Sequence, residues 1–139
     1  MVGLSVAIVE EGKLTFAKGY GITQTGSKDR VTTDTVFRWA SLSKSLAAAT
    51  VLTVSDEGHF GLNSPAIAHA PSLKLPKASG ATTIENILSH QTGIERGAHD
   101  TWIEAGKPAK LSRTGLKTMK RICEPSLCHT YQNVAFDAA

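Results

Sequence analysis

The sequence ASLSKSLAAATVLTVSD, residues 40–56, carries more information about the fold than any other stretch of this chain. Its apolar side chains run nearly all the way round a helical wheel, which predicts a helix over 40–56 that is buried at the centre of its layer. Glu57 and Gly58 follow and should end it. Ser41 and Lys44 stand three residues apart, so both side chains lie on one face, with about 5–6 Å between their Cβ atoms.

This serine and lysine have the chemistry of a nucleophile and its base. Ser41 falls in the first turn of the predicted helix, where free backbone N–H groups and the positive end of the helix dipole favour a developing oxyanion. Apolar surroundings would favour the neutral amine of Lys44, the form that can accept a proton. The alternative is structural, with Ser41 as a plain N-cap and Lys44 in solvent, because this spacing also occurs by chance.

Upstream of this helix the side-chain pattern is that of strands. Residues 3–10 (GLSVAIVE) alternate between two faces, and residues 14–20 (LTFAKGY) form a matching run after a turn in which Gly12 supplies a positive φ. We therefore predict a β-hairpin over 3–20. Gly19, Gly21 and Gly26 are interpreted as turn glycines, because their spacing is not the GxGxxG of a dinucleotide loop.

Downstream the pattern is helical. Prolines divide a loop over 61–80, and Thr82 with Glu85 forms a capping box that opens a second helical segment, closed by Gly93. Weaker helical stretches cover 98–105 and 112–122. Two strands followed only by helices predict an α+β fold with an unpaired sheet edge.

Composition excludes several classes of protein. The chain has 139 residues, 41% of them hydrophobic, which is the size and make-up of one globular domain rather than a disordered, collagen-like or coiled-coil chain. Its 15 basic and 12 acidic residues are scattered, so we expect no nucleic-acid partner. It lacks the run of about 18 apolar residues that spans a membrane. The N-terminal residues lack the pattern of a signal peptide, so we expect either a cytoplasmic protein or a chain that has been shortened to its mature or engineered N-terminus.

The spacing of the cysteines and histidines does not predict a metal site. Cys123 and Cys128 lack the ligand spacing of a zinc site, and they either bridge a tight loop, which would imply an oxidising compartment, or stay free. The histidines other than His90 show no HxH or HxxxH spacing, so we expect no metal site and no cofactor.

Three segments resemble the serine β-lactamase and penicillin-binding protein superfamily, most closely class C β-lactamases and related esterases. Residues 35–45 (TVFRWASLSKS) carry its SxxK element, and residues 83–94 (TIENILSHQTGI) are similar to its LLSHTSGL helix end. Tyr131 and Asn133 form its YxN element. The order of hairpin, SxxK helix, SHxTG and YxN matches too, so the resemblance covers nearly the whole chain.

The resemblance implies a role for each of these residues. Ser41 would be the acylated nucleophile, and Lys44 its base or proton relay. Tyr131 would move protons to and from Ser41 and the leaving nitrogen, while Asn133 would bind the amide side chain of the substrate. His90 would be structural, bonding backbone at a helix end. The substrate would be a small β-lactam or ester, and the location periplasmic or secreted.

One element of the superfamily is missing from this sequence. A Lys-Thr-Gly or His-x-Gly strand should follow YxN, but the chain ends six residues after Asn133. We therefore expect 1–139 to be a single partial domain, the N-terminal portion, with a hairpin over 3–20 and a helical region over 36–139. An oxyanion donor on that strand would be lost, which typically costs about 10²–10³ in rate.

Three hypotheses follow from the sequence. The first is a serine hydrolase that opens β-lactam rings, impaired by the missing strand. The second is an esterase or DD-peptidase-like hydrolase that uses the same residues. The third is a non-catalytic fragment that associates with itself through the exposed sheet edge.

Overall fold

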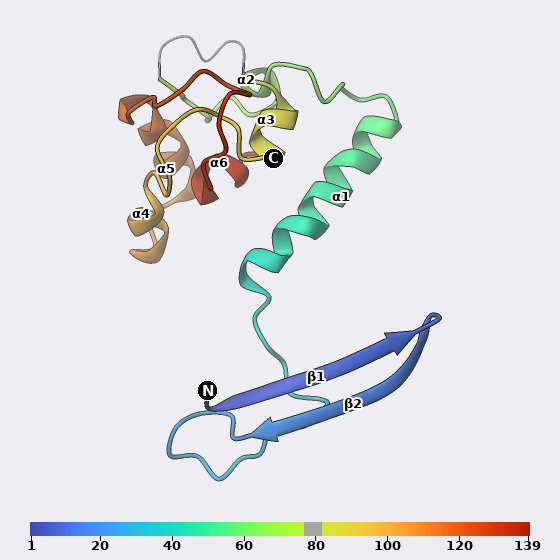
Figure 1. The fold of residues 1–139 in the computed structure, drawn as a ribbon. Coiled ribbons are helices and arrows are strands. Elements are labelled where there is room, and N and C mark those ends of the chain that lie inside the picture. The colour runs from blue at the N-terminus through green and yellow to red at the C-terminus, as the bar shows by residue number, and fades with distance from the viewer. Residues whose placement is uncertain (77–81) are drawn as a thin grey trace. The chain divides into compact units, whose positions relative to one another are not determined.

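The chain consists of a β-hairpin followed by helices, as Figure 1 shows. The structure is a computed structural model, and it describes residues 1–76 and 82–139. Contacts divide the chain into two compact units, Met1–Ala40 and Ser41–Ala139, which are described separately below. The predicted α+β class is confirmed.

The first unit holds the hairpin. Strands β1 (Gly3–Glu10) and β2 (Lys13–Gly21) pair antiparallel, with Gly3 opposite Gly21 and Glu10 opposite Lys13. The two residues between the strands, Glu11 and Gly12, have φ of 48° and 74°. Positive φ at both positions gives the turn that suits the right-handed twist of paired strands. The predicted hairpin and its glycine turn are therefore confirmed.

Of the three glycines near the end of the hairpin, Gly26 lies in a turn, whereas Gly19 and Gly21 lie in β2. Gly21 and Gly26 have φ of 76° and 83°, which a residue with a side chain rarely adopts. At Gly19 a Cβ would collide with the backbone carbonyl of Val31. Here the glycine is required by close backbone approach rather than by a turn.

The second unit is helical. Its elements are a 3₁₀ turn Ala40–Leu42 at the boundary between the units, α1 (Ser43–Asp56), α2 (Ala66–His69), α3 (Ile84–Leu88), α4 (Asp100–Glu104), α5 (Ala109–Gly115), a 3₁₀ turn Leu116–Thr118 and α6 (Asn133–Phe136). The sequence did not predict the short helices α2 and α6. Of the predicted loop over 61–80, residues 77–80 lie outside the described residues.

Helix α1 ends at the predicted residue, but it begins at Ser43 rather than at residue 40, where a 3₁₀ turn stands instead, and it lacks the predicted burial. It ends as expected, with Gly58 at φ 85° donating its N–H to the Ser55 carbonyl at 2.9 Å. No residue of α1 is buried, however, and Leu46 is 57% exposed. Because apolar residues surround the helix, one face can pack on the core of this unit, as Val51 does, and the other faces stay open. The prediction of a buried central helix is wrong for this chain.

The second helical segment begins one residue later than predicted. Thr83, not Thr82, is the N-cap: its hydroxyl accepts the Asn86 N–H at 3.2 Å, and the Asn86 side chain accepts the Thr83 N–H at 3.1 Å. Thr82 is fully buried, and its carbonyl accepts the Ala66 N–H at 3.0 Å. The predicted capping box of Thr82 and Glu85 is therefore wrong, because Thr82 belongs to the core.

The core of the second unit comes from its short helices and the loops between them. It consists of Ala66, Leu73, Leu75, Ile84, Ile87, Ile94, Ala98, Leu116, Val134 and Ala135. The last two belong to α6, so the segment that follows Tyr131 is fixed in the core. Within residues 1–76 and 82–139, no helix has the length and hydrophobicity needed to cross a membrane.

Candidate active site

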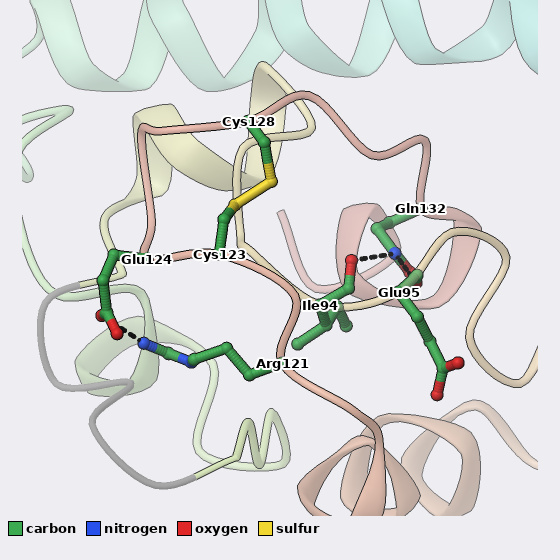
Figure 2. The surroundings of a disulfide bond; sticks show 7 residues. All are labelled: Ile94, Glu95, Arg121, Cys123, Glu124, Cys128 and Gln132. Carbon is green, nitrogen blue, oxygen red and sulfur yellow. Dashed lines mark hydrogen bonds and ion pairs between the residues drawn. A yellow bond between two sulfur atoms is a disulfide. The ribbon is translucent and has the colours of Figure 1, made fainter.

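The segment before α6 aims two polar side chains to the same side. Gln132 has extended backbone angles, φ −135° and ψ 118°. Side chains alternate in extended backbone, so Tyr131 and Asn133 share one side and Gln132 takes the other. Gln132 is fully buried, and its Nε2 donates to the carbonyls of Ile94, at 3.2 Å, and Glu95 (Figure 2). Because Gln132 is buried between them in the sequence, Tyr131 and Asn133 both face away from the buried side.

His90 makes two hydrogen bonds to the backbone of the segment that carries Tyr131. Its carbonyl accepts the Thr130 N–H at 2.8 Å, and its Nδ1 accepts the Gln132 N–H at 3.2 Å. Burial lowers the pKa of His90, and the charges of His129 and Lys44 lower it further. Since Nδ1 can accept only when it carries no proton, both facts favour the neutral ring. His90 bonds backbone, as predicted, and thereby places Tyr131.

A disulfide closes the loop that leads into this segment. Cys123 and Cys128 are joined, which settles the alternative that the sequence left open (Figure 2). Within the loop, Ser126 donates its N–H to the Gln91 carbonyl at 3.0 Å, and its hydroxyl accepts from Asn86 Nδ2 at 2.9 Å. The bridged loop is therefore tied to the turn that carries His90.

The structure brings the four predicted site residues together. Ser41 lies in the 3₁₀ turn directly before α1, and its Oγ is 2.7 Å from the Tyr131 hydroxyl, one hydroxyl donating to the other. Lys44, one turn along, donates from Nζ to Ser41 Oγ at 3.4 Å and to Asn133 Oδ1 at 2.6 Å. The contacts of Ser41 with Tyr131 and of Lys44 with Asn133 join residues about 90 positions apart in the sequence.

The cluster changes the acidity of the phenol. Lys44 lowers the pKa of Tyr131 below its ordinary value of 10.0, and the hydrogen bond with Ser41 lowers it further. Desolvation and the negative charge of Asp100 act in the opposite direction but are outweighed. A phenolate beside Ser41 can accept the proton of the serine hydroxyl, which is what a nucleophilic serine requires.

Asn133 is bound at both ends of its amide. Its Oδ1 accepts from Lys44, and its Nδ2 donates to Asp100 Oδ2 at 2.9 Å. One lone pair and one N–H of the amide remain for another partner. Sequence reasoning missed Asp100, because an aspartate in the first turn of a helix has an ordinary explanation in the helix dipole.

Comparison with known proteins places this geometry in a family. A family model described as Beta-lactamase matches residues 1–139. The chain is 32% identical to the Unguisins hydrolase ungD' of Aspergillus campestris, covering 99% of this chain and 27% of that protein. It is 27% identical to the D-alanyl-D-alanine-carboxypeptidase/endopeptidase AmpH of Escherichia coli, covering 97% of this chain and 36% of that protein.

Solved structures agree in fold. The octameric penicillin-binding protein homologue from Pyrococcus abyssi superposes with a TM-score of 0.84 at 21% identity, over 99% of this chain and 33% of that one. SurE with D-Leu superposes with a TM-score of 0.71 at 20% identity, over 96% and 30%. The chain thus spans about a third of the length of these relatives. It belongs to the β-lactamase family, within the superfamily of serine β-lactamases and penicillin-binding proteins.

Proposed function

We propose that this chain carries the acylation site of a serine hydrolase that opens β-lactam rings through an acyl-serine intermediate. The observation that carries the proposal is the contact of Ser41 Oγ with the Tyr131 hydroxyl at 2.7 Å, with Lys44 Nζ 3.4 Å from the same oxygen. A serine with two proton-handling groups in reach is the arrangement of an activated nucleophile.

In this proposal Ser41 Oγ attacks the carbonyl carbon of the lactam, and its proton passes to the phenolate of Tyr131, which Lys44 stabilises. The carbon–nitrogen bond then breaks, and the same proton is delivered to the leaving nitrogen. Water hydrolyses the resulting ester, which returns the proton to Ser41 and releases the ring-opened acid. The lowered pKa of Tyr131 supports its part, because more phenolate is present near neutral pH.

The other groups of the cluster would bind and orient. Asn133 Nδ2 has a second N–H that makes no hydrogen bond to another described residue, and this N–H would donate to the amide side chain of the substrate. The backbone N–H of Ser41, before a helix of 14 residues, would stabilise the developing oxyanion.

A second candidate substrate is a peptide or ester. One relative is named a D-alanyl-D-alanine-carboxypeptidase/endopeptidase, and one related structure was solved with D-Leu. Attack on a peptide amide uses the same proton transfers as attack on a lactam. The difference lies in which acyl group the site accepts and how quickly water releases it.

Turnover assays with three substrates separate these candidates. We expect a chromogenic cephalosporin to be hydrolysed by the chain and not by Ser41→Ala, with Ser43→Ala as the matched control that keeps the activity. Turnover of short-chain aryl esters or of a D-alanyl-D-alanine peptide, without cephalosporin turnover, would reject β-lactam opening and support the second candidate.

Three further assignments belong to the same proposal. We assign 1–139 to one partial domain, because the family model runs through both compact units.

A periplasmic or secreted location is supported by the disulfide, since disulfides persist in oxidising compartments. Mass spectrometry of the chain isolated from its native compartment, with free thiols blocked at lysis, tests this location, and reduced cysteines would contradict it.

Self-association through the hairpin is the third assignment. Both faces of the hairpin carry exposed apolar side chains, Leu4 and Ile8 on one face of β1 and Val9 on the other, and exposed strand edges pair readily with other chains. Size-exclusion chromatography should show a concentration-dependent oligomer, while a monomer at all concentrations would contradict this assignment.

A further inference from the structure

We propose that Asp100 is a positioning residue, which fixes the orientation of the Asn133 side-chain amide and thereby holds Lys44 Nζ beside Ser41. The carboxylate accepts from Asn133 Nδ2 at 2.9 Å, and Asn133 Oδ1 accepts from Lys44 Nζ at 2.6 Å. The inference rests on the proposed function for the roles of Ser41 and Lys44. The geometric link itself does not depend on that function.

The chemistry of the three groups allows only one arrangement. An ionised carboxylate only accepts hydrogen bonds, and an ammonium only donates them, whereas a side-chain amide has one donating and one accepting end. Asn133 lies between Asp100 and Lys44, so its NH₂ must face the carboxylate and its oxygen the ammonium. Rotating the side-chain amide of Asn133 by half a turn would break both hydrogen bonds. It would place the amide oxygen against the carboxylate of Asp100 and the NH₂ group against the ammonium of Lys44.

The backbone turn before α4 places the carboxylate of Asp100 beside Asn133. Asp100 begins α4, and its N–H donates to the Gly97 carbonyl at 3.0 Å. Gly97 has φ 66°, and a Cβ there would lie 3.2 Å from Asp100 Oδ2, so the glycine leaves room for the carboxylate. Gly97 also donates its N–H to the Tyr131 carbonyl at 3.0 Å. One turn therefore fixes both Asp100 and the segment that carries Tyr131.

The second oxygen of the carboxylate argues against a purely stabilising role. Asp100 Oδ1 is buried and makes no hydrogen bond to another described residue. Burying a carboxylate oxygen without a partner costs stability. The hydrogen bond of Asp100 to Asn133 therefore points to a role in orienting that amide rather than in stabilising α4.

The phenol of Tyr131 reports on this link, because Asp100 affects it in two opposite ways. The groups that act on its pKa are Lys44 on α1, the hydroxyl of Ser41 and Asp100 on α4. The tilted ring of His90, which itself contacts His129, lies against the Tyr131 ring. Lys44 is the largest cause of the lowered pKa of Tyr131, and the direct charge of Asp100 is the smallest contribution and raises that pKa. If Asp100 positions Lys44, its loss should therefore raise the pKa of Tyr131.

The test is a titration of tyrosinate absorbance in a Tyr20→Phe background, where Tyr131 is the one tyrosine left. We expect Asp100→Asn, which keeps the shape but lets the Asn133 amide rotate, to move the midpoint of Tyr131 to higher pH. Glu104→Gln is the matched control, since it removes the same charge from an exposed position of the same helix. Its midpoint should stay with that of the parent.

Two results would overturn the proposal. A midpoint that moves to lower pH in Asp100→Asn would mean that only the direct charge matters. An unchanged midpoint in a variant with native circular dichroism would mean that Asp100 does not act on the cluster. Should Asp100→Asn not fold, Asn133→Ala tests the same link, because Lys44 then loses its acceptor and the midpoint must again rise; an unchanged midpoint there counts against the proposal.

The reaction of Ser41 with an electrophile supplies a separate readout. We expect the rate at which a fluorophosphonate labels Ser41 to fall at least tenfold in Asp100→Asn and to stay within twofold of the parent in Glu104→Gln, and equal rates in the two variants would contradict the positioning role. Failure of the parent chain to react would count against the proposed function. The tyrosinate titration would still decide the role of Asp100, so the two failures are distinguishable.

Discussion

Removing the Tyr131 hydroxyl tests whether the phenol and Lys44 work as one unit. Tyr131→Phe deletes an oxygen 2.7 Å from Ser41 Oγ and leaves the ring beside His90, whose centroid is 4.5 Å away. A positioned general base typically contributes about 10²–10⁴ in rate. We expect acylation of Ser41 to slow by about that factor, which corresponds to about 3–5 kcal/mol of activation free energy.

Lys44→Ala should cause a loss of similar size, because Lys44 is the main reason that the pKa of Tyr131 is lowered. Groups that share one proton fail together, so the double variant should be about as slow as either single variant. Independent groups would multiply their effects and slow the reaction by about 10⁴–10⁸ instead. The two models therefore differ by a factor that ordinary kinetics can measure.

The assay is the rate of acylation by a labelled penicillin, followed by intact mass for the parent, both single variants and the double variant. Tyr20→Phe is the matched control, because it removes the other phenol of the chain and should leave the rate unchanged. Multiplicative losses in the double variant would refute the shared-proton account.

Three further predictions concern stability. Gly93→Ala should lower the free energy of unfolding by more than the roughly 1–2 kcal/mol of left-handed strain, because its φ is 79° and a Cβ would collide with the Cys123 carbonyl. Replacing Cys123 and Cys128 by serine should cost about 2 kcal/mol in loop-closure entropy. His90 has a pKa below 6.5, so its contribution to stability is full above pH 6.5 and is lost as pH falls through the lower folded value.

Denaturant titration measures all three. For the glycine, Gly106→Ala is the control, since Gly106 also has positive φ but open space around it; equal losses would contradict the clash with the carbonyl. For the disulfide, no change in midpoint on reduction would contradict the entropy estimate. For His90, a His90→Asn variant should show a flatter dependence on pH, and an unaltered dependence would assign the effect elsewhere.

The elements with a clear period could be predicted from the sequence. The hairpin and α1 follow from alternation and from helical patterning over eight or more residues. Helices α2 and α6 span four residues each, which is too short to show a helical period. They exist because tertiary contacts bury them, as the buried Val134 and Phe136 of α6 illustrate.

The residues of the site also differ in how far the sequence alone predicts them. Ser41 and Lys44 are local in sequence, so their spacing alone places them on one face. Tyr131 and Asn133 carry no pairing signal of their own, and only the resemblance to a known family connects them with Ser41. Asp100 meets Asn133 across 33 residues through a turn at Gly97. A contact of this kind depends on the folded backbone and cannot be read from spacing.

The burial of α1 could not be predicted either. A helix that is apolar all the way round predicts partners on every side. The chain spans about a third of the length of its relatives, and within the described residues only one face of α1 packs on the core. The apolar pattern thus predicts a wider set of contacts than α1 makes with the described residues.

The central claim is that Ser41 becomes acylated, and intact mass after incubation with a labelled penicillin tests it most directly. We predict an increase equal to one penicillin, located on the peptide that contains Ser41, absent in Ser41→Ala and present in Ser43→Ala. An adduct that persists in Ser41→Ala, or no adduct on the folded parent chain, would contradict the claim.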